Sequence, residues 1–292
     1  MFYEVKIPEP EADRKQISAM VVLNPADSRR LLAKATVVLP EVQNAWKNGM
    51  IIIARGITTA FITEELFGIK VEPKAGQTVG MVCNGITTSN TGPPPSTRHV
   101  IRQGEVVEDA DSNVEILNFG PDDVFIKGAN AVDSQGNAGI YVASVKAGTI
   151  GMAWPILTPR DCHLIISVSL EKLVPSVIEA AKYTGLYRFK YSTGLPIKLV
   201  PVPLAKVITE IQAFAILAGV RAYHIGSGGV GGSEGSVHLA LEGDAERVER
   251  AFELAKSVKG EPPVSLPDTF SVTSAADYDY DALAQLAVLK GL

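Results

Sequence analysis

The tetrapeptide Gly-Ile-Thr-Thr occurs twice in this chain, at residues 56–59 and 85–88, and its groups suit the binding of an anion. The first copy lies between the apolar run 50–54 and a helical pattern, an order that predicts a strand, a tight glycine turn and a helix. Backbone N–H groups and the hydroxyls of Thr58 and Thr59 would then face an anion such as phosphate or carboxylate at the helix N-terminus. A plain strand-to-helix turn capped by threonine is an equally supported alternative.

The second copy belongs to a long polar loop predicted over residues 84–97, which follows a buried strand predicted over 79–83. Loops of this length are usually surface segments, but some serve as lids over binding sites. Cys83 ends the predicted strand and is the better of the two cysteines as a thiol nucleophile, with simple packing as the alternative.

A stretch rich in Gly, Ala and Ser follows a predicted strand at residues 123–126 and carries the polar groups Lys127, Asn130, Asp133 and Lys146. A lysine at the carboxyl end of a strand can neutralise a ligand phosphate, and an aspartate nearby can move a proton. Glycine in this stretch lets the backbone approach a ligand closely. A solvated turn is the alternative for the segment around Asp133.

Two further features of the sequence argue against other kinds of site. The glycine-rich segment 226–235 joins two predicted strands and lacks the Gly-Lys-Ser/Thr sequence of a nucleotide-binding loop, so it predicts a flexible hairpin connection. The four histidines occur singly on predicted strands, so we expect neither a metal site nor another cofactor.

The sequence predicts strands that alternate with helices, and these elements would position the candidate residues. This alternation is typical of an α/β protein with a mainly parallel, Rossmann-like sheet flanked by helices. A helix should run from its N-cap at Asn24 to about Val38. After the sheet, a long amphipathic helix reaching Ala218, two strands and a further helix predict a smaller α+β domain of ferredoxin-like type. We predict an N-terminal arm (residues 1–19), the α/β domain (20–200), the smaller domain (201–262) and a tail with one helix (263–292).

Composition excludes several classes of protein. The chain has 292 residues, of which 46% are hydrophobic, and a formal charge of -5, so it lacks the basic field that captures nucleic acid. No apolar stretch reaches the roughly 18 residues of a membrane span, and the charged N-terminus predicts no secretory signal. Two cysteines predict no disulfide framework, so we expect a cytoplasmic protein without nucleic-acid or membrane partners.

Three segments, in the same order, resemble the superfamily of ribose-5-phosphate isomerase, glucosamine-phosphate deaminase and the CoA transferases. Residues 52–60 resemble the isomerase's first strand and phosphate loop, and residues 125–137 resemble its active-site turn. Residues 164–174 and 195–201 resemble the strand and the Lys-Leu-Val motif that lead into its small lid. The resemblance implies this superfamily's fold, a phosphorylated small-metabolite ligand and, together with the apolar C-terminal helix, a homo-oligomer.

The acids that the superfamily uses are absent at the matching positions. Lys127 and Asn130 stand where the isomerase has the two acids of its Asp-Gly-Ala-Asp turn. No Asp or Glu occurs between Ser134 and Arg160, where the resemblance would place a general-base or nucleophilic glutamate. These departures disfavour ribose-phosphate isomerisation by the known residues and CoA transfer through a glutamate.

Two functions stay open at this point, and whether the protein is an enzyme is open with them. The first is to bind, and to isomerise or otherwise transform, a small anionic metabolite in a crevice at the carboxyl ends of the strands. The alternative is a non-catalytic ligand-sensing or assembly protein on the same fold. The candidate ligand-binding residues are Gly56, Thr58, Thr59, Asn84, Gly85, Thr87, Lys127, Gly128 and Asn130, and the candidates for proton transfer or nucleophilic attack are Asp133, Lys146 and Cys83.

Overall fold

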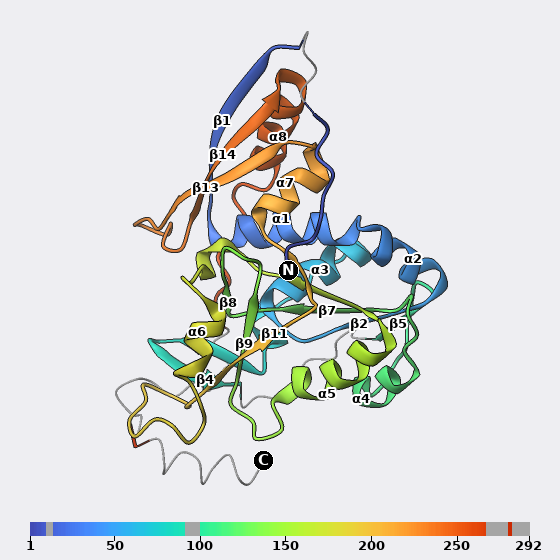
Figure 1. Ribbon diagram of the computed structural model, residues 1–292, viewed down its shortest axis with the longest axis vertical. Helices are drawn as coiled ribbons and strands as arrows, with labels where there is room; N and C mark the ends of the chain where they lie inside the picture. Colours follow the sequence, from blue (N-terminus) through green and yellow to red (C-terminus); the bar gives the residue numbers. More distant parts are fainter. Residues whose placement is uncertain (10–13, 91–99, 267–279, 282–292) are drawn as a thin grey trace.

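The computed structural model describes residues 1–9, 14–90, 100–266 and 280–281, and its centre is a six-stranded mixed sheet (Figure 1). The strand order is β12-β10-β7-β2-β5-β6; the first four strands are parallel, and β5 and β6 are antiparallel to their neighbours. The strands span Met50–Ile53 (β2), Val100–Arg102 (β5), Glu105–Val106 (β6), Val124–Gly128 (β7), His163–Ser167 (β10) and Lys206–Ile208 (β12). The mixed α/β class is confirmed, while its Rossmann-like and ferredoxin-like character stays a prediction.

Helices cover the central sheet, so its parallel strands can be apolar on both faces. All four residues of β2 are buried, as are Val124, Phe125 and Ile126 of β7. The helices span Pro25–Val37 (α1), Pro40–Asn48 (α2), Ile57–Phe67 (α3), Ser112–Glu115 (α4), Gly148–Leu157 (α5), Val177–Lys182 (α6), Glu210–Ala218 (α7) and Ala245–Ser257 (α8). Four 3-10 turns span Lys74–Gln77 (η1), Ile116–Asn118 (η2), Thr158–Arg160 (η3) and Leu170–Lys172 (η4).

The strand, turn and helix predicted around the first Gly-Ile-Thr-Thr segment are present. Strand β2 leads through Gly56 into α3, which ends at Gly68 in the left-handed conformation (φ 63°) that glycine adopts without strain. Helix α1 also forms where the sequence predicts it. The backbone N–H of Asn24 donates to the carboxylate of Asp27 (3.1 Å), which stabilises the start of that helix.

A smaller antiparallel sheet lies above the central sheet in Figure 1, with α1 between the two. Its strand order is β1-β14-β13, with spans Gln16–Leu23 (β1), Arg221–Ser227 (β13) and Val237–Asp244 (β14). Helix α8 packs on β1 and β14, and α7 packs on β13 and α1. The two strands and the helix predicted at this end of the chain are therefore present.

Two segments differ from the sequence-based expectation in this region. Residues 16–19, which we predict as part of an arm, belong to β1, because their alternating apolar side chains pair with β14 from the far end of the chain. Lys206–Ile208, predicted as helix, forms the edge strand β12, and α7 begins only after Thr209, whose hydroxyl accepts from the N–H of Ile211.

Two small sheets complete the described structure. One has the order β11-β9-β8, with spans Ala131–Val132 (β8), Ala138–Val142 (β9) and Lys198–Val202 (β11). The other is the hairpin of Gly80–Cys83 (β3) and Ile86–Ser89 (β4). The predicted loop 84–97 thus contains a strand, and the strand predicted as buried is half-exposed, because only one hairpin partner covers it. The predicted tail helix lies outside the described residues.

Among the described residues, we find no helix that is both long enough and apolar enough to cross a membrane.

Candidate functional site

The carboxyl ends of β2, β7, β10 and β12 meet at one edge of the central sheet, because these four strands are parallel neighbours. In an open α/β sheet this edge is where ligands bind. The chain continues from it into the α3 turn, the segment after Lys127, the η4 turn and α7.

The N-terminus of α3 offers free hydrogen-bond donors. Gly56 precedes the helix in an extended conformation, and the hydroxyl of Thr59 donates back to its carbonyl oxygen (2.9 Å). Thr58 is only 7% exposed, and its hydroxyl has no hydrogen-bond partner within the described part of the chain. The backbone N–H groups of Ile57, Thr58 and Thr59 likewise have no partner among these residues. Donor groups without a protein partner at a helix N-terminus are groups that a ligand can satisfy.

Lys127 reaches this edge from the neighbouring strand β7. Its side chain is half-buried and makes no hydrogen bond or ion pair with any residue that the structure describes. Burial and, to a smaller extent, the positive charge of Lys172 together lower the pKa of Lys127 to about 8. A Cβ atom on the next residue, Gly128, would lie 3.9 Å from the Cβ of Thr58 and 3.9 Å from the carbonyl oxygen of Ser167. The fold thus brings Gly128 directly beside Thr58.

Lys172 supplies a second cation at this edge, from η4. Its ammonium donates to the carbonyl oxygen of Ala129 (2.9 Å). Burial and the positive charge of Arg29 lower the pKa of Lys172, whereas the carboxylates of Glu171 and Glu210 raise it. Arg29 and Glu171 form an ion pair at 2.8 Å, so one positive and one negative charge beside Lys172 neutralise each other.

Glu210 is the titratable group at this edge that the sequence analysis misses. It is the first residue of α7 and is completely buried. Its Oε2 accepts from the backbone N–H of Leu170 (2.9 Å), whereas its Oε1 has no hydrogen-bond partner. Burial raises the pKa of Glu210, and the Leu170 N–H and the hydroxyl of Ser169 act in the opposite direction. The sequence-based prediction places Glu210 inside a long helix. The signal that would have identified it is its position directly after a short strand, at the start of the helix.

Asp133 lies on the neighbouring small sheet, and hydrogen bonds within the protein occupy its carboxylate. Oδ1 accepts from the backbone N–H groups of Gln135 and Asn137, both at 3.0 Å, and Oδ2 accepts from the N–H of Val177 and from the Asn137 amide, also at 3.0 Å. Burial raises its pKa, but these hydrogen bonds outweigh burial and the net pKa of Asp133 is lowered. The aspartate closes the 133–137 turn and holds the start of α6, so we give it no part in proton transfer.

The structure places the other candidates of the Gly/Ala-rich stretch on the surface. The carbonyl oxygen of the Asn130 side chain accepts from the backbone N–H of Tyr141 (3.0 Å), which ties it to β9. Lys146 is exposed in the turn before α5, and its backbone N–H donates to the hydroxyl of Ser144 (3.3 Å). Within the described residues, neither side chain forms a hydrogen bond or ion pair with Lys127 or Thr58.

Cys83 and the second Gly-Ile-Thr-Thr copy belong to the β3–β4 hairpin. Asn84 and Gly85 form its turn with positive φ angles of 52° and 76°. The hydroxyl of Thr87 donates to the carbonyl oxygen of Leu195 (2.6 Å), so this threonine holds the hairpin to the segment before β11. Burial raises the pKa of the Cys83 thiol, which disfavours the reactive thiolate.

The glycine-rich segment between β13 and β14 reaches the same edge of the molecule. A Cβ atom on Gly235 would lie 3.1 Å from Oε2 of Glu171 and 3.3 Å from the Cγ of Pro25. Because Gly235 also has a positive φ of 78°, the close approach to Glu171 depends on glycine at this position. The predicted hairpin connection therefore packs against the residues that surround Lys172.

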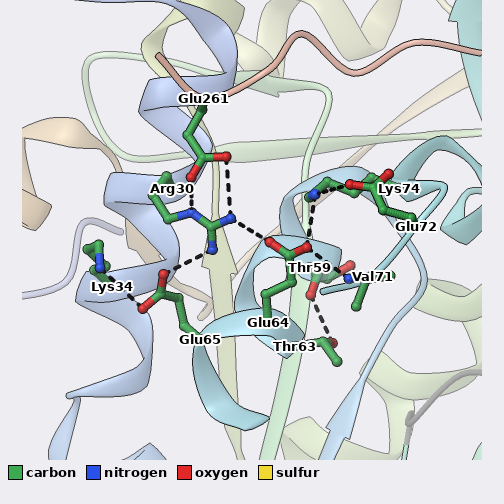
Figure 2. A network of polar contacts seen from close by, with 10 residues as sticks. All are labelled: Arg30, Lys34, Thr59, Thr63, Glu64, Glu65, Val71, Glu72, Lys74 and Glu261. Carbon is green, nitrogen blue, oxygen red and sulfur yellow. Dashed lines mark hydrogen bonds and ion pairs between the residues drawn. The ribbon is translucent and has the colours of Figure 1, made fainter. Parts of the chain in front are cut away.

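A network of charged side chains fixes α3 against α1 (Figure 2). The guanidinium of Arg30 donates to Glu64 (2.5 Å), Glu65 (2.9 Å) and Glu261 (2.5 Å), and it lies over the ring of Phe61. Lys74 contacts Glu64 from the other side at 2.9 Å. These ion pairs lower the pKa of Glu64 even though burial raises it. The network borders a cavity of about 260 Å³ and anchors the helix whose first turn carries Thr58.

Comparison of this chain with protein-family models, with curated proteins and with solved structures found no match. The described residues also hold no group of three or more His, Cys, Asp or Glu side chains that could bind a metal ion.

Proposed function

We propose that this protein binds a small anionic metabolite between the N-terminus of α3 and Lys127. The observation that carries the proposal is a pair of groups without a partner among the described residues: the Thr58 hydroxyl in the first turn of α3 and the Lys127 ammonium on strand β7. Gly128 lies beside Thr58 without a side chain of its own. Three free backbone N–H groups add to the donors at this point. This combination suits phosphate or carboxylate, because helix N-termini and lysine both stabilise negative charge.

A phosphorylated metabolite fits the site better than a simple carboxylate. A phosphoryl group offers three acceptor oxygens and close to two negative charges at neutral pH, and it can use the α3 N–H groups and Lys127 together. The superfamily resemblance of residues 52–60 supports the same ligand class. The proposal concerns binding, and it does not require the acids that are absent at the superfamily positions.

The alternative, a sensor or assembly protein without turnover, also has support in the geometry. The carboxylate of Asp133 is fully occupied, and the pKa of Cys83 is raised. Two of the three sequence-predicted catalytic groups are therefore poorly suited to chemistry. Binding at Thr58 and Lys127 is common to both functions, so it is the first property to test.

A thermal-shift screen against sugar phosphates, methyl phosphate, lactate and acetate tests the proposal. A ligand at 100 times its dissociation constant adds about 2.7 kcal/mol to the stability of the folded state, which raises the melting temperature measurably. We expect a phosphate monoester to give the largest shift, and we expect Lys127→Met and Thr58→Val to abolish it. Lys47→Met, which removes an exposed lysine of α2, is the matched control and should keep the shift. No shift with any anion, or a shift that survives both site variants, would contradict the proposal.

A further inference from the structure

The loop between α6 and β11 presents both tyrosine rings and positive charges to solvent, and we call residues 183–191 the tyrosine loop. Its exposed rings are those of Tyr183 (60% exposed), Tyr187 (62%) and Tyr191 (66%). The guanidinium of Arg188 lies over the Tyr183 ring, 5.7 Å from its centroid, and the ammonium of Lys190 lies over the Tyr191 ring at 5.1 Å. These contacts hold cations and aromatic rings together on one exposed surface, and a surface of this kind marks a site of interaction.

The sequence around the tyrosine loop is basic, whereas the tail of the same chain is acidic. Residues 180–209 carry five Lys or Arg residues and no Asp or Glu. Residues 262–289 carry four Asp residues and no Lys, Arg or Glu. Three of these aspartates alternate with two tyrosines over residues 277–281. The two segments are therefore complementary in charge, which favours contact between them.

The described part of the tail lies against the tyrosine loop, at the lower left of Figure 1. Asp281 forms an antiparallel bridge with Tyr191, and the backbone N–H of Ser192 donates to the carbonyl oxygen of Tyr280 (3.1 Å). Residues directly opposite each other in an antiparallel pair lie on the same face. An acidic residue of the tail is therefore placed beside the ring that Lys190 covers.

The segment that receives the tail is itself fixed to β4. The N–H of Thr87 donates to the carbonyl oxygen of Thr193 (3.1 Å), and the N–H of Leu195 donates to the carbonyl oxygen of Thr87 (2.7 Å). A Cβ atom on Gly194 would clash with the backbone of Thr87, so this close pairing depends on glycine. Residues 191–195 thus offer a held, extended backbone to which a further strand can add.

We propose that the tyrosine loop is a docking surface for an acidic, extended chain segment, and that its occupant is this chain's own tail over residues 277–281. The tail backbone adds as an antiparallel strand, and the side chains supply the selectivity. Because side chains alternate along a strand, the three aspartates of this segment would share the face on which Asp281 meets Tyr191 and Lys190. The inference uses none of the residues of the α3 anion site, so it is independent of the proposed function.

Disulfide trapping in the full chain tests this proposal. Ser192→Cys and Tyr280→Cys, combined with Cys83→Ser and Cys162→Ser, leave one thiol on each of the two paired segments. Opposite residues of a hydrogen-bonded antiparallel pair have Cα atoms about 5.5 Å apart, a separation that suits a disulfide. We expect a disulfide within a single chain, identified by intact mass and by non-reducing electrophoresis.

Charge reversal on the loop tests whether its cations select the tail. Arg188→Glu with Lys190→Glu turns attraction into repulsion, and we expect trapping to be about tenfold slower. Asp279→Lys with Asp281→Lys should restore trapping in this reversed chain, a rescue that mere disturbance of the loop would not give. Lys47→Glu, which reverses an exposed charge of α2, is the matched control and should leave the rate unchanged.

Amide hydrogen exchange in the unaltered chain gives a second readout that needs no variant. The Ser192 amide, which donates to Tyr280, should be protected at low salt and should exchange several-fold faster in about 1 M NaCl, where the Debye length falls to about 3 Å. The Leu195 amide, which donates to Thr87, should stay protected at both salt concentrations.

Three results would overturn the proposal. A disulfide between two chains would show that the tail of a second copy fills the loop. A trapping rate that is the same after charge reversal would remove the role of Arg188 and Lys190. No trapping in a chain that keeps its thermal unfolding transition, together with an unprotected Ser192 amide, would remove the docking itself.

Discussion

At the scale of single residues, the structure separates polar groups that the fold uses from polar groups that it leaves free. Thr87 and Thr58 occupy the same position in the two Gly-Ile-Thr-Thr copies, yet among the described residues only the Thr87 hydroxyl has a hydrogen-bond partner, the carbonyl oxygen of Leu195. Asp133 and Glu210 show the same contrast between a fully satisfied carboxylate and one with a free oxygen. A hydroxyl without a protein partner stays available to a ligand, and this is why we assign function to Thr58 rather than to Thr87.

The two threonines therefore predict opposite outcomes for the same substitution. Thr58→Val removes a hydroxyl without a partner, so we expect unchanged or slightly higher stability and roughly tenfold weaker binding of methyl phosphate. Thr87→Val removes a hydrogen bond, so we expect a loss of about 1 kcal/mol and unchanged binding. Urea denaturation and isothermal titration calorimetry measure the two properties, and equal effects of the two variants on binding would refute the assignment.

Asp133 should behave as a structural residue. Asp133→Ala leaves the buried N–H groups of Asn137 and Val177 without an acceptor, and we expect a cost of about 2–4 kcal/mol in the free energy of unfolding. Because the folded-state pKa of Asp133 is lowered, its contribution is present above the ordinary aspartate pKa of about 3.9 and is lost as the pH falls through the folded value. Denaturation between pH 3 and 7 should show this dependence in the unaltered chain and less of it in the variant.

At the scale of helices and strands, sequence patterns predict an element well when one continuous segment of the chain determines the structure of that element. The apolar run of β2, the turn at Gly56 and the helix α3 follow from a continuous stretch of sequence. The strands β1, β4 and β12 are missed because their partners are distant or their length is short: β1 pairs with β14, which is formed more than 200 residues later. The same limit applies to the site: Thr58 and Lys127 come at the ends of predicted strands, whereas Lys172 lies in the 3-10 turn η4 and Glu210 follows the unpredicted strand β12.

The membership of β1 in the small sheet is directly testable. Leu23→Ala creates a cavity at a fully buried position where β1 meets β14, so we expect a loss of about 2–4 kcal/mol. Met20→Ala changes an exposed side chain of the same strand and should stay within about 0.5 kcal/mol of the unaltered chain. If β1 did not pair with β14, chemical denaturation would show no difference between the two variants.

The network of Figure 2 gives a prediction for α3. Arg30→Met leaves the buried Glu64 with Lys74 and the Val71 N–H as its remaining partners, and we expect a loss of about 3 kcal/mol. Glu261→Gln, which keeps the side chain's shape and lies nearer the surface, should cost about 1 kcal/mol or less. A double-mutant cycle of Arg30 with Glu64, measured by chemical denaturation, should give a coupling energy well above that of Arg30 with Glu261; equal couplings would contradict the central role of Glu64.

At the scale of the whole molecule, α1 joins the two sheets, because it packs on α3 of the central layer and on α7 of the small one. The glycine-rich hairpin of the small sheet then reaches Glu171, beside the lysines of the central sheet. This edge of the central sheet thus lies close to the contact between the two layers. Assembly into a homo-oligomer stays a prediction.

The most direct test of the account is an NMR titration of the full chain with methyl phosphate. The account predicts that the amide signals of Ile57, Thr58, Thr59 and Gly128 shift together, with one dissociation constant, and that Lys127→Met weakens all of these shifts. Shifts confined to the cavity lined by Arg30, Glu64 and Lys74, or no shift at the α3 N-terminus at saturating ligand, would contradict it.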